Sequence, residues 1–186
     1  METEFEREVL ERSYLSDENV ELWMKYLKVK KYYYKGLSEK LADASALSEA
    51  NWIVRKEMMS CEEGGIDVQV GDICYIDFGQ AYLNEAGYQH FGVVMAICHK
   101  KALVIPMTSN PLQYENAYDD ENNPLGKIHL LKIGQPKGLN KPSVLFMNDA
   151  KFINTARIIG VKSHIPEKSP LFRKIQQRLL RVMFYE

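Results

Sequence analysis

The amino-acid sequence predicts an α+β protein, in which a helical N-terminal extension precedes a small antiparallel β-barrel and a C-terminal helix. Three observations predict this order. Apolar residues recur at helical spacing through residues 1–60. Short runs rich in Val, Ile and aromatic residues follow, no stretch between them is long enough for the helix of a parallel crossover, and a last helical segment closes the chain. We expect the extension to span residues 1–65 and the barrel domain residues 66–186, because Gly64 and Gly65 mark a linker.

The helices are predicted from the spacing of apolar residues. Those of the extension cover residues 2–13, 17–35 and 38–59. Ser16 or Asp17 can cap the second of these helices, and Gly36 can end it. The C-terminal helix begins after Ser169, with Pro170 at its first position. Its expected apolar stripe consists of Leu171, Ile175, Leu179 and Met183.

The strands are predicted from β-branched and aromatic runs that Gly, Asn, Lys or Pro residues separate. Six such runs cover residues 72–79, 90–98, 102–109, 127–133, 143–149 and 152–163. With no crossover helices between them, these strands favour a closed or half-open antiparallel barrel.

Composition and cysteine usage limit the classes of function. Of the 186 residues, 46% are hydrophobic and 26% are charged, as in soluble globular proteins. No apolar run approaches the ~20 residues that span a bilayer, and the acidic start lacks the basic and apolar regions of a secretory signal. The three cysteines have no CxxC spacing, and the four histidines fit no zinc-ligand pattern. We therefore expect a cytoplasmic protein with free thiols, no metal, no cofactor and no membrane partner.

The charge differs between the two expected parts of the chain. Residues 1–65 carry 10 Lys and Arg against 14 Asp and Glu, whereas residues 66–186 carry 14 against 11. A mildly basic second part is compatible with a polyanionic partner, and equally with an ordinary solvated surface. The acidic extension can be a dimerisation arm, or a helical segment that covers a basic surface of the barrel.

Two adjacent hydroxyl residues, Thr108 and Ser109, end the apolar run of residues 104–107. Hydroxyls at the end of a strand commonly make local hydrogen bonds in the following turn. They can also donate to a phosphate group that lies beside the sheet edge. The pair alone does not distinguish these two readings.

Three segments of the second part carry motifs in a distinctive order. They are GDICYIDFGQAYLNEAGYQHFGVV at 71–94, IPMTS at 105–109 and SVLFMNDAKFINTARIIG at 143–160. In this order they resemble the motifs of the PemK/MazF-like toxins, small ribonucleases of bacterial toxin–antitoxin systems. In the first segment the matching residues are Gly71, Asp72, Glu85, Gly87, Val93 and Val94. Where the family commonly has Arg-Pro, this chain has His90 and Phe91.

The resemblance implies an SH3-like barrel that cleaves single-stranded RNA without a metal ion and leaves a 2′,3′-cyclic phosphate and a 5′-hydroxyl. It implies a homodimer and a cognate antitoxin as partners. The implied catalytic residues are His90, Thr108 and Ser109. The implied substrate-binding residues are Glu85, Lys151, Asn154 and Arg157.

Several alternatives stay open at the level of sequence. His90 can act as general acid or general base, since an imidazole changes charge near neutral pH. Glu85, Lys151 and Arg157 can instead be solvated surface residues. The loss of the usual Arg is also compatible with a non-catalytic module that binds RNA or protein. A third reading is a toxin that acts on a protein target such as gyrase, because one fold hosts many functions.

Overall fold

The computed structural model describes residues 17–119 and 121–184, so the helix expected over residues 2–13 lies outside it. Helix α2 spans Asp17–Lys35 and helix α3 spans Glu39–Arg55, close to the ranges expected. The chain forms two compact units that divide between Asp43 and Ala44, within α3. Residues 44–55 of α3 therefore group with the strands. The expected boundary between residues 65 and 66 stays a prediction.

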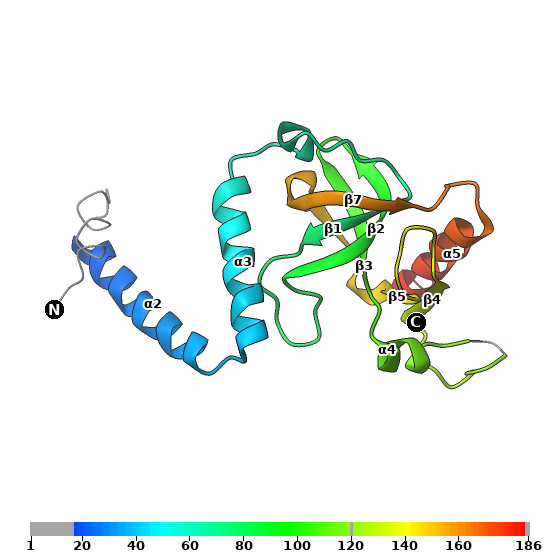
Figure 1. Ribbon diagram of the computed structural model, residues 1–186, viewed down its shortest axis with the longest axis horizontal. Coiled ribbons are helices and arrows are strands. Elements are labelled where there is room, and N and C mark those ends of the chain that lie inside the picture. The colour runs from blue at the N-terminus through cyan, green and yellow to red at the C-terminus, as the bar shows by residue number, and fades with distance from the viewer. Residues whose placement is uncertain (1–16, 120, 185–186) are drawn as a thin grey trace. The chain divides into compact units, whose positions relative to one another are not determined.

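The second unit is built on one antiparallel sheet (Figure 1). Its strands are β1 (Asp72–Asp77), β2 (Gln89–Cys98), β3 (Lys101–Thr108), β4 (Leu130–Gly134), β5 (Ser143–Phe146), β6 (Lys151–Asn154) and β7 (Ile158–His164). The strand order is β4-β5-β3-β2-β1-β7, and β6 pairs with the part of β3 that β5 leaves open.

The sheet curls because β6 and β7 are consecutive in the chain but lie beside different strands. β6 pairs with β3 and β7 pairs with β1, and the 3₁₀ turn η3 (Thr155–Arg157) joins them. Five strands thus enclose an inner apolar cluster of Cys74, Ile76, Phe78, Val94, Ala102, Val104, Ile153 and Ile158, to which Cys61 of the turn η1 (Cys61–Gly64) also belongs. This confirms the predicted fold class, an antiparallel barrel-like sheet with helices before and after it.

Helix α5 (Pro170–Phe184) covers the outer face of the sheet near β4, as Figure 1 shows. Its cap is the predicted one, since the Ser169 hydroxyl accepts a hydrogen bond of 3.1 Å from the Phe172 N–H. The expected stripe is partly wrong. Phe172, Ile175 and Leu179 are buried, whereas Met183 is 56% exposed. Leu171 is half-buried and packs against the same core cluster, and in the last turn Val182 packs against that cluster instead of Met183.

Two further differences arise from side chains that cap short helices. The run expected as one strand over residues 152–163 is broken, because the Asn154 side chain accepts a 2.8 Å hydrogen bond from the Ala156 N–H and starts η3. Helix α4 (Pro111–Asn116), which is not among the predicted elements, forms after β3. Its cap is Asn110, which accepts a 2.9 Å hydrogen bond from the Leu112 N–H.

Among the described helices, none has both the length and the apolar character needed to cross a bilayer.

Candidate functional site

The loop between β1 and β2, residues 78–88, is the centre of the candidate site. Its neck is closed by two backbone hydrogen bonds, from Phe78 to Tyr88 at 2.7 Å and from Tyr88 to Gly79 at 2.6 Å. Asn84 and Tyr88 adopt positive φ angles of 69° and 56°. This conformation is unusual for a bulky residue such as Tyr88 and costs on the order of 1–3 kcal/mol. The surroundings of the loop therefore impose its shape.

His90 is fixed at the end of this loop. It lies in β2 opposite Ile76, is half-buried, and its Nδ1 is 2.6 Å from the Gly87 carbonyl oxygen. A carbonyl oxygen only accepts, so Nδ1 carries a proton in this contact. In the neutral ring, Nε2 is then the unprotonated nitrogen, and it has no partner among the described residues. Nε2 can accept a proton from a substrate, or donate one when the ring is charged.

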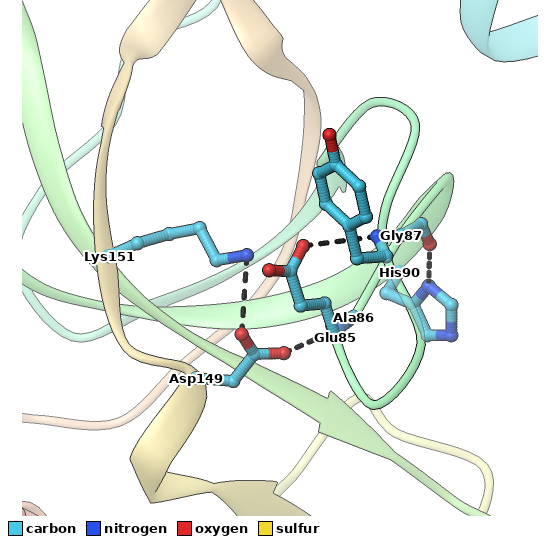
Figure 2. Close-up of polar contacts among 7 residues, drawn as sticks. Glu85, Ala86, Gly87, His90, Asp149 and Lys151 are labelled. Atoms are coloured by element: carbon cyan, nitrogen blue, oxygen red, sulfur yellow. Dashed lines mark hydrogen bonds and ion pairs between the residues drawn. The ribbon is translucent and has the colours of Figure 1, made fainter.

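Lys151 reaches the same loop through an acidic residue that the sequence did not single out. Its Nζ lies 3.3 Å from Asp149 Oδ1, and the other carboxylate oxygen of Asp149 accepts a hydrogen bond from the Ala86 N–H (Figure 2). The Lys151 Nζ also lies 5.8 Å from the centroid of the Phe78 ring. Asp149 therefore connects the start of β6 to the tip of the loop and balances the charge of Lys151.

Arg157 contacts the base of the loop. It is exposed, and its Nη1 donates a 3.3 Å hydrogen bond to the Asp77 carbonyl oxygen. Gly79 makes room for this contact, because a Cβ at that position would lie 3.1 Å from the same Nη1. Arg157 thus presents a guanidinium group beside the loop without an ion-pair partner among the described residues.

The Asp77 carboxylate is a second functional feature that the sequence reasoning missed. It is 4% exposed and accepts four hydrogen bonds. The donors are the Ser48 hydroxyl (2.7 Å), the Asn51 amide (2.7 Å), the Gly79 N–H (2.9 Å) and the Gln89 amide (3.1 Å). The sequence held one sign of this role, because the apolar run of β1 ends at Asp77. A charged side chain at the end of a buried strand needs partners, which predicts hydrogen bonds to its carboxylate.

The second half of α3 is held against the strands by this carboxylate and by two further contacts. The Arg55 guanidinium donates to the carbonyl oxygens of Ala156 and Ile158, at 3.1 Å and 3.2 Å. The Ser45 hydroxyl donates to the Gln80 side chain at 3.1 Å. Residues 45–55 therefore fix the base of the loop and the start of β7, which are the elements that position His90 and Arg157.

Thr108 and Ser109 are placed near His90 but are not bonded to it. Met107 pairs with Phe91, so Thr108 and His90 occupy neighbouring positions at the same end of their strands. The Thr108 hydroxyl accepts a 3.2 Å hydrogen bond from the Asn110 N–H, and Ser109 is exposed. The structure thus supports the local reading of Thr108, as part of the turn between β3 and α4.

Glu85 and Asn154 make only local contacts. The Glu85 carboxylate is exposed and accepts a 3.3 Å hydrogen bond from the Tyr82 N–H. The Asn154 side chain caps η3, and its backbone pairs with Lys101, at the end of β3 away from Thr108. Asn154 is therefore separated from Thr108 along β3.

The structure gathers Glu85, His90, Lys151 and Arg157 around one loop, while Asn154 caps η3. Figure 2 shows the His90 ring on the opposite side of residues 85–87 from the Lys151–Asp149 pair. The arrangement offers two cationic groups and one titratable imidazole, which suits binding of a polyanion and proton transfer. Among the described residues, no cluster of three or more His, Cys, Asp or Glu side chains could hold a metal ion.

No protein family matches this chain, and no curated protein matches it. Among solved structures, the chain is similar to MazF from Deinococcus radiodurans, with 12% identity, a TM-score of 0.46, and coverage of 62% of this chain and 96% of that one. It is also similar to a MazE–MazF structure from the same organism, with 12% identity, a TM-score of 0.43, and coverage of 64% and 97%.

Proposed function

We propose that this chain is the toxin of a toxin–antitoxin system and acts as a metal-independent endoribonuclease on single-stranded RNA. The order of the motifs in residues 71–160 supports this proposal. The observation that carries it is the orientation of His90, whose Nδ1–H is held by the Gly87 carbonyl while Nε2 has no protein partner among the described residues. An imidazole held in this way is suited to proton transfer at one defined nitrogen.

The proposed reaction is a general acid–base cleavage that starts at the RNA 2′-hydroxyl. A base removes the proton of the RNA 2′-hydroxyl, and the 2′-oxygen attacks the adjacent phosphorus. The bond to the 5′-oxygen breaks, and an acid protonates that oxygen, which leaves a 2′,3′-cyclic phosphate and a 5′-hydroxyl. His90 takes one of the two proton-transfer roles. Lys151 and Arg157 stabilise the phosphoryl oxygens, and Glu85 contacts bases of the substrate.

The proposal includes protein partners. A cognate antitoxin binds the toxin and blocks access of RNA, and the toxin acts as a homodimer in the cytoplasm without a cofactor. These partners are proposed on the motif resemblance of residues 71–160.

The test is a cleavage assay on mixed-sequence single-stranded RNA in the presence of EDTA, with mapping of both new ends. We expect cleavage that EDTA does not reduce, cyclic phosphate at one end and a 5′-hydroxyl at the other, and no cleavage of DNA of the same sequence, because the 2′-hydroxyl is the nucleophile. Intact RNA after incubation with folded protein would contradict the proposal.

A second candidate, a non-catalytic binding module, is favoured by one group of contacts. The Thr108 and Asn154 side-chain oxygens accept local backbone hydrogen bonds, and Asp149 balances the charge of Lys151. His90 also stands where the related motif has Arg. Binding of RNA without turnover, with an affinity unchanged in His90→Ala, would support this candidate over the ribonuclease.

A further inference from the structure

Helix α2 carries two apolar stripes, and one of them is open to solvent. Val20, Met24, Leu27 and Tyr34 form a half-buried stripe. Leu22, Tyr26, Val29 and Tyr33 form the other stripe and are 66%, 48%, 68% and 51% exposed. We call this second set the exposed stripe. A solvent-facing helix normally has one apolar face, so the exposed stripe needs a separate explanation.

The spacing of the exposed stripe is that of a helix–helix seam. Its members follow one another at intervals of four, three and four residues, which is the a/d pattern of a heptad. A stripe with this spacing lies along one side of a helix and packs against a partner helix of similar length. The expected occupant is therefore a helix and not a strand or a flat surface.

The order of residues along the stripe fits a second copy of the same helix in the antiparallel direction. In that pairing, Leu22 of one copy lies opposite Tyr33 of the other, and Tyr26 lies opposite Val29. Every layer then combines an aliphatic with an aromatic side chain. A parallel pairing would instead place tyrosine against tyrosine and leucine against leucine, in layers of unequal width.

The charges along α2 favour the same direction. Its first ten residues hold three acidic residues and one lysine, whereas its last nine hold four lysines and no acidic residue. Antiparallel helices place the acidic end of each copy beside the basic end of the other, and parallel helices bring like charges together.

We propose that the exposed stripe of α2 is a self-association surface, on which α2 of a second copy packs antiparallel. The proposal stands on the described residues of α2 and is independent of any ribonuclease activity.

The first measurement is the mass of the full chain in solution across a range of concentrations, by sedimentation velocity. Val29 lies at the centre of the seam, so Val29→Glu buries a carboxylate in each copy and should raise the dissociation constant by about 100-fold or more. The matched control is Leu125→Glu, which makes the same change at a residue that is 97% exposed and distant in sequence from α2. We expect the control to associate like the parent chain.

The second measurement fixes the direction and remains informative if Val29→Glu fails to fold. Single variants Leu22→Cys and Tyr33→Cys are prepared with Cys98→Ser, because Cys98 is the exposed native cysteine. The antiparallel seam predicts that the mixed pair forms an intermolecular disulfide and that Leu22→Cys alone does not. The proposal requires both results. A parent chain that stays monomeric, a mass that Val29→Glu leaves unchanged, or preferential self-crosslinking of Leu22→Cys would each overturn it.

Discussion

Hydrogen bonds to the backbone orient three of the candidate side chains. The Thr108 hydroxyl oxygen and the Asn154 amide oxygen each accept a bond from an N–H two residues ahead, so the turns that follow β3 and β6 orient these side chains, while their own O–H and N–H groups can still donate. His90 also bonds a backbone group, and it uses only Nδ1 for this contact. The imidazole therefore combines a fixed orientation with a ring nitrogen available to a ligand.

Lys151 provides a prediction about affinity for RNA. Lys151→Ala should weaken binding of single-stranded RNA and lower the slope of log affinity against log salt concentration by about 0.7, the loss of one phosphate contact. Asp149→Asn should strengthen binding, because it removes the negative charge 3.3 Å from the Lys151 Nζ. Fluorescence anisotropy at several salt concentrations measures both effects. The control is Lys137→Ala, at an exposed lysine. An equal loss of RNA affinity in this variant would contradict a specific role of Lys151.

The three cysteines provide a prediction about reactivity. Burial raises the pKa of the Cys74 thiol to about 12, and burial also raises the pKa of the Cys61 thiol. Both thiols are therefore neutral at pH 8, whereas Cys98 is exposed. A thiol reagent such as DTNB should titrate one cysteine in the native protein and three in denaturant. Rapid reaction of all three in the native protein would contradict the buried positions of Cys61 and Cys74.

At the scale of elements, the sequence predicts the helices and strands that have regular apolar spacing or clear cap residues. Helix α2, the strands β1 to β3 and the cap of α5 at Ser169 follow from apolar spacing and from cap residues. The break between β6 and β7 was missed, because the sequence predicts residues 152–163 as one strand, whereas the Asn154 side chain interrupts it by starting η3. Local propensity does not show where a side chain will accept a hydrogen bond from a nearby backbone N–H and so end a strand.

The contacts between α3 and the loop could not be predicted for a different reason. Ser48 and Asn51 are ordinary residues of a polar helix until the fold brings them against Asp77, more than 25 residues later in the chain. The motifs likewise indicated His90, Lys151 and Arg157 as site residues, but not that Asp149 would join Lys151 to the loop. Pairings over such sequence distances depend on the tertiary structure.

Asp77 provides a prediction about stability. Asp77→Ala should lower the free energy of unfolding by about 3 kcal/mol or more, because it leaves donors from α3, β2 and the loop without their shared acceptor. Ser48→Ala removes one of these bonds and should cost about 1–2 kcal/mol. Urea denaturation gives both values. Asp67→Ala, at an exposed carboxylate, is the matched control and should change stability by less than about 0.5 kcal/mol.

At the scale of the whole molecule, the sequence changes from helical to strand-forming at Gly64 and Gly65. The compact unit that contains the strands begins at Ala44 and so includes the second half of α3. Ser48, Asn51 and Arg55 account for this, since each bonds a residue of the strands or of η3. The second half of α3 thus acts as a structural part of the barrel unit.

Two shortened chains test this division. A chain of residues 44–186 should unfold at a temperature close to that of the full chain. A chain of residues 66–186 should be less stable by about 3 kcal/mol or more, because the buried Asp77 carboxylate loses two of its donors and β7 loses its contacts with Arg55. Thermal unfolding followed by circular dichroism compares them. Equal stability of the two shortened chains would show that α3 contributes nothing to the barrel unit.

The central claim is that His90 performs proton transfer on RNA, and one measurement tests it most directly. The full chain, His90→Ala and His99→Asn are incubated with the same mixed-sequence single-stranded RNA in EDTA, and initial rates are compared. His99 is the matched control, since it is exposed in the β2–β3 turn at a φ of 54°, which Asn adopts readily. We predict cleavage by the parent chain and the control, and a loss of about 10²–10⁴-fold in His90→Ala. Equal rates for all three proteins, or no cleavage by any of them, would contradict the claim.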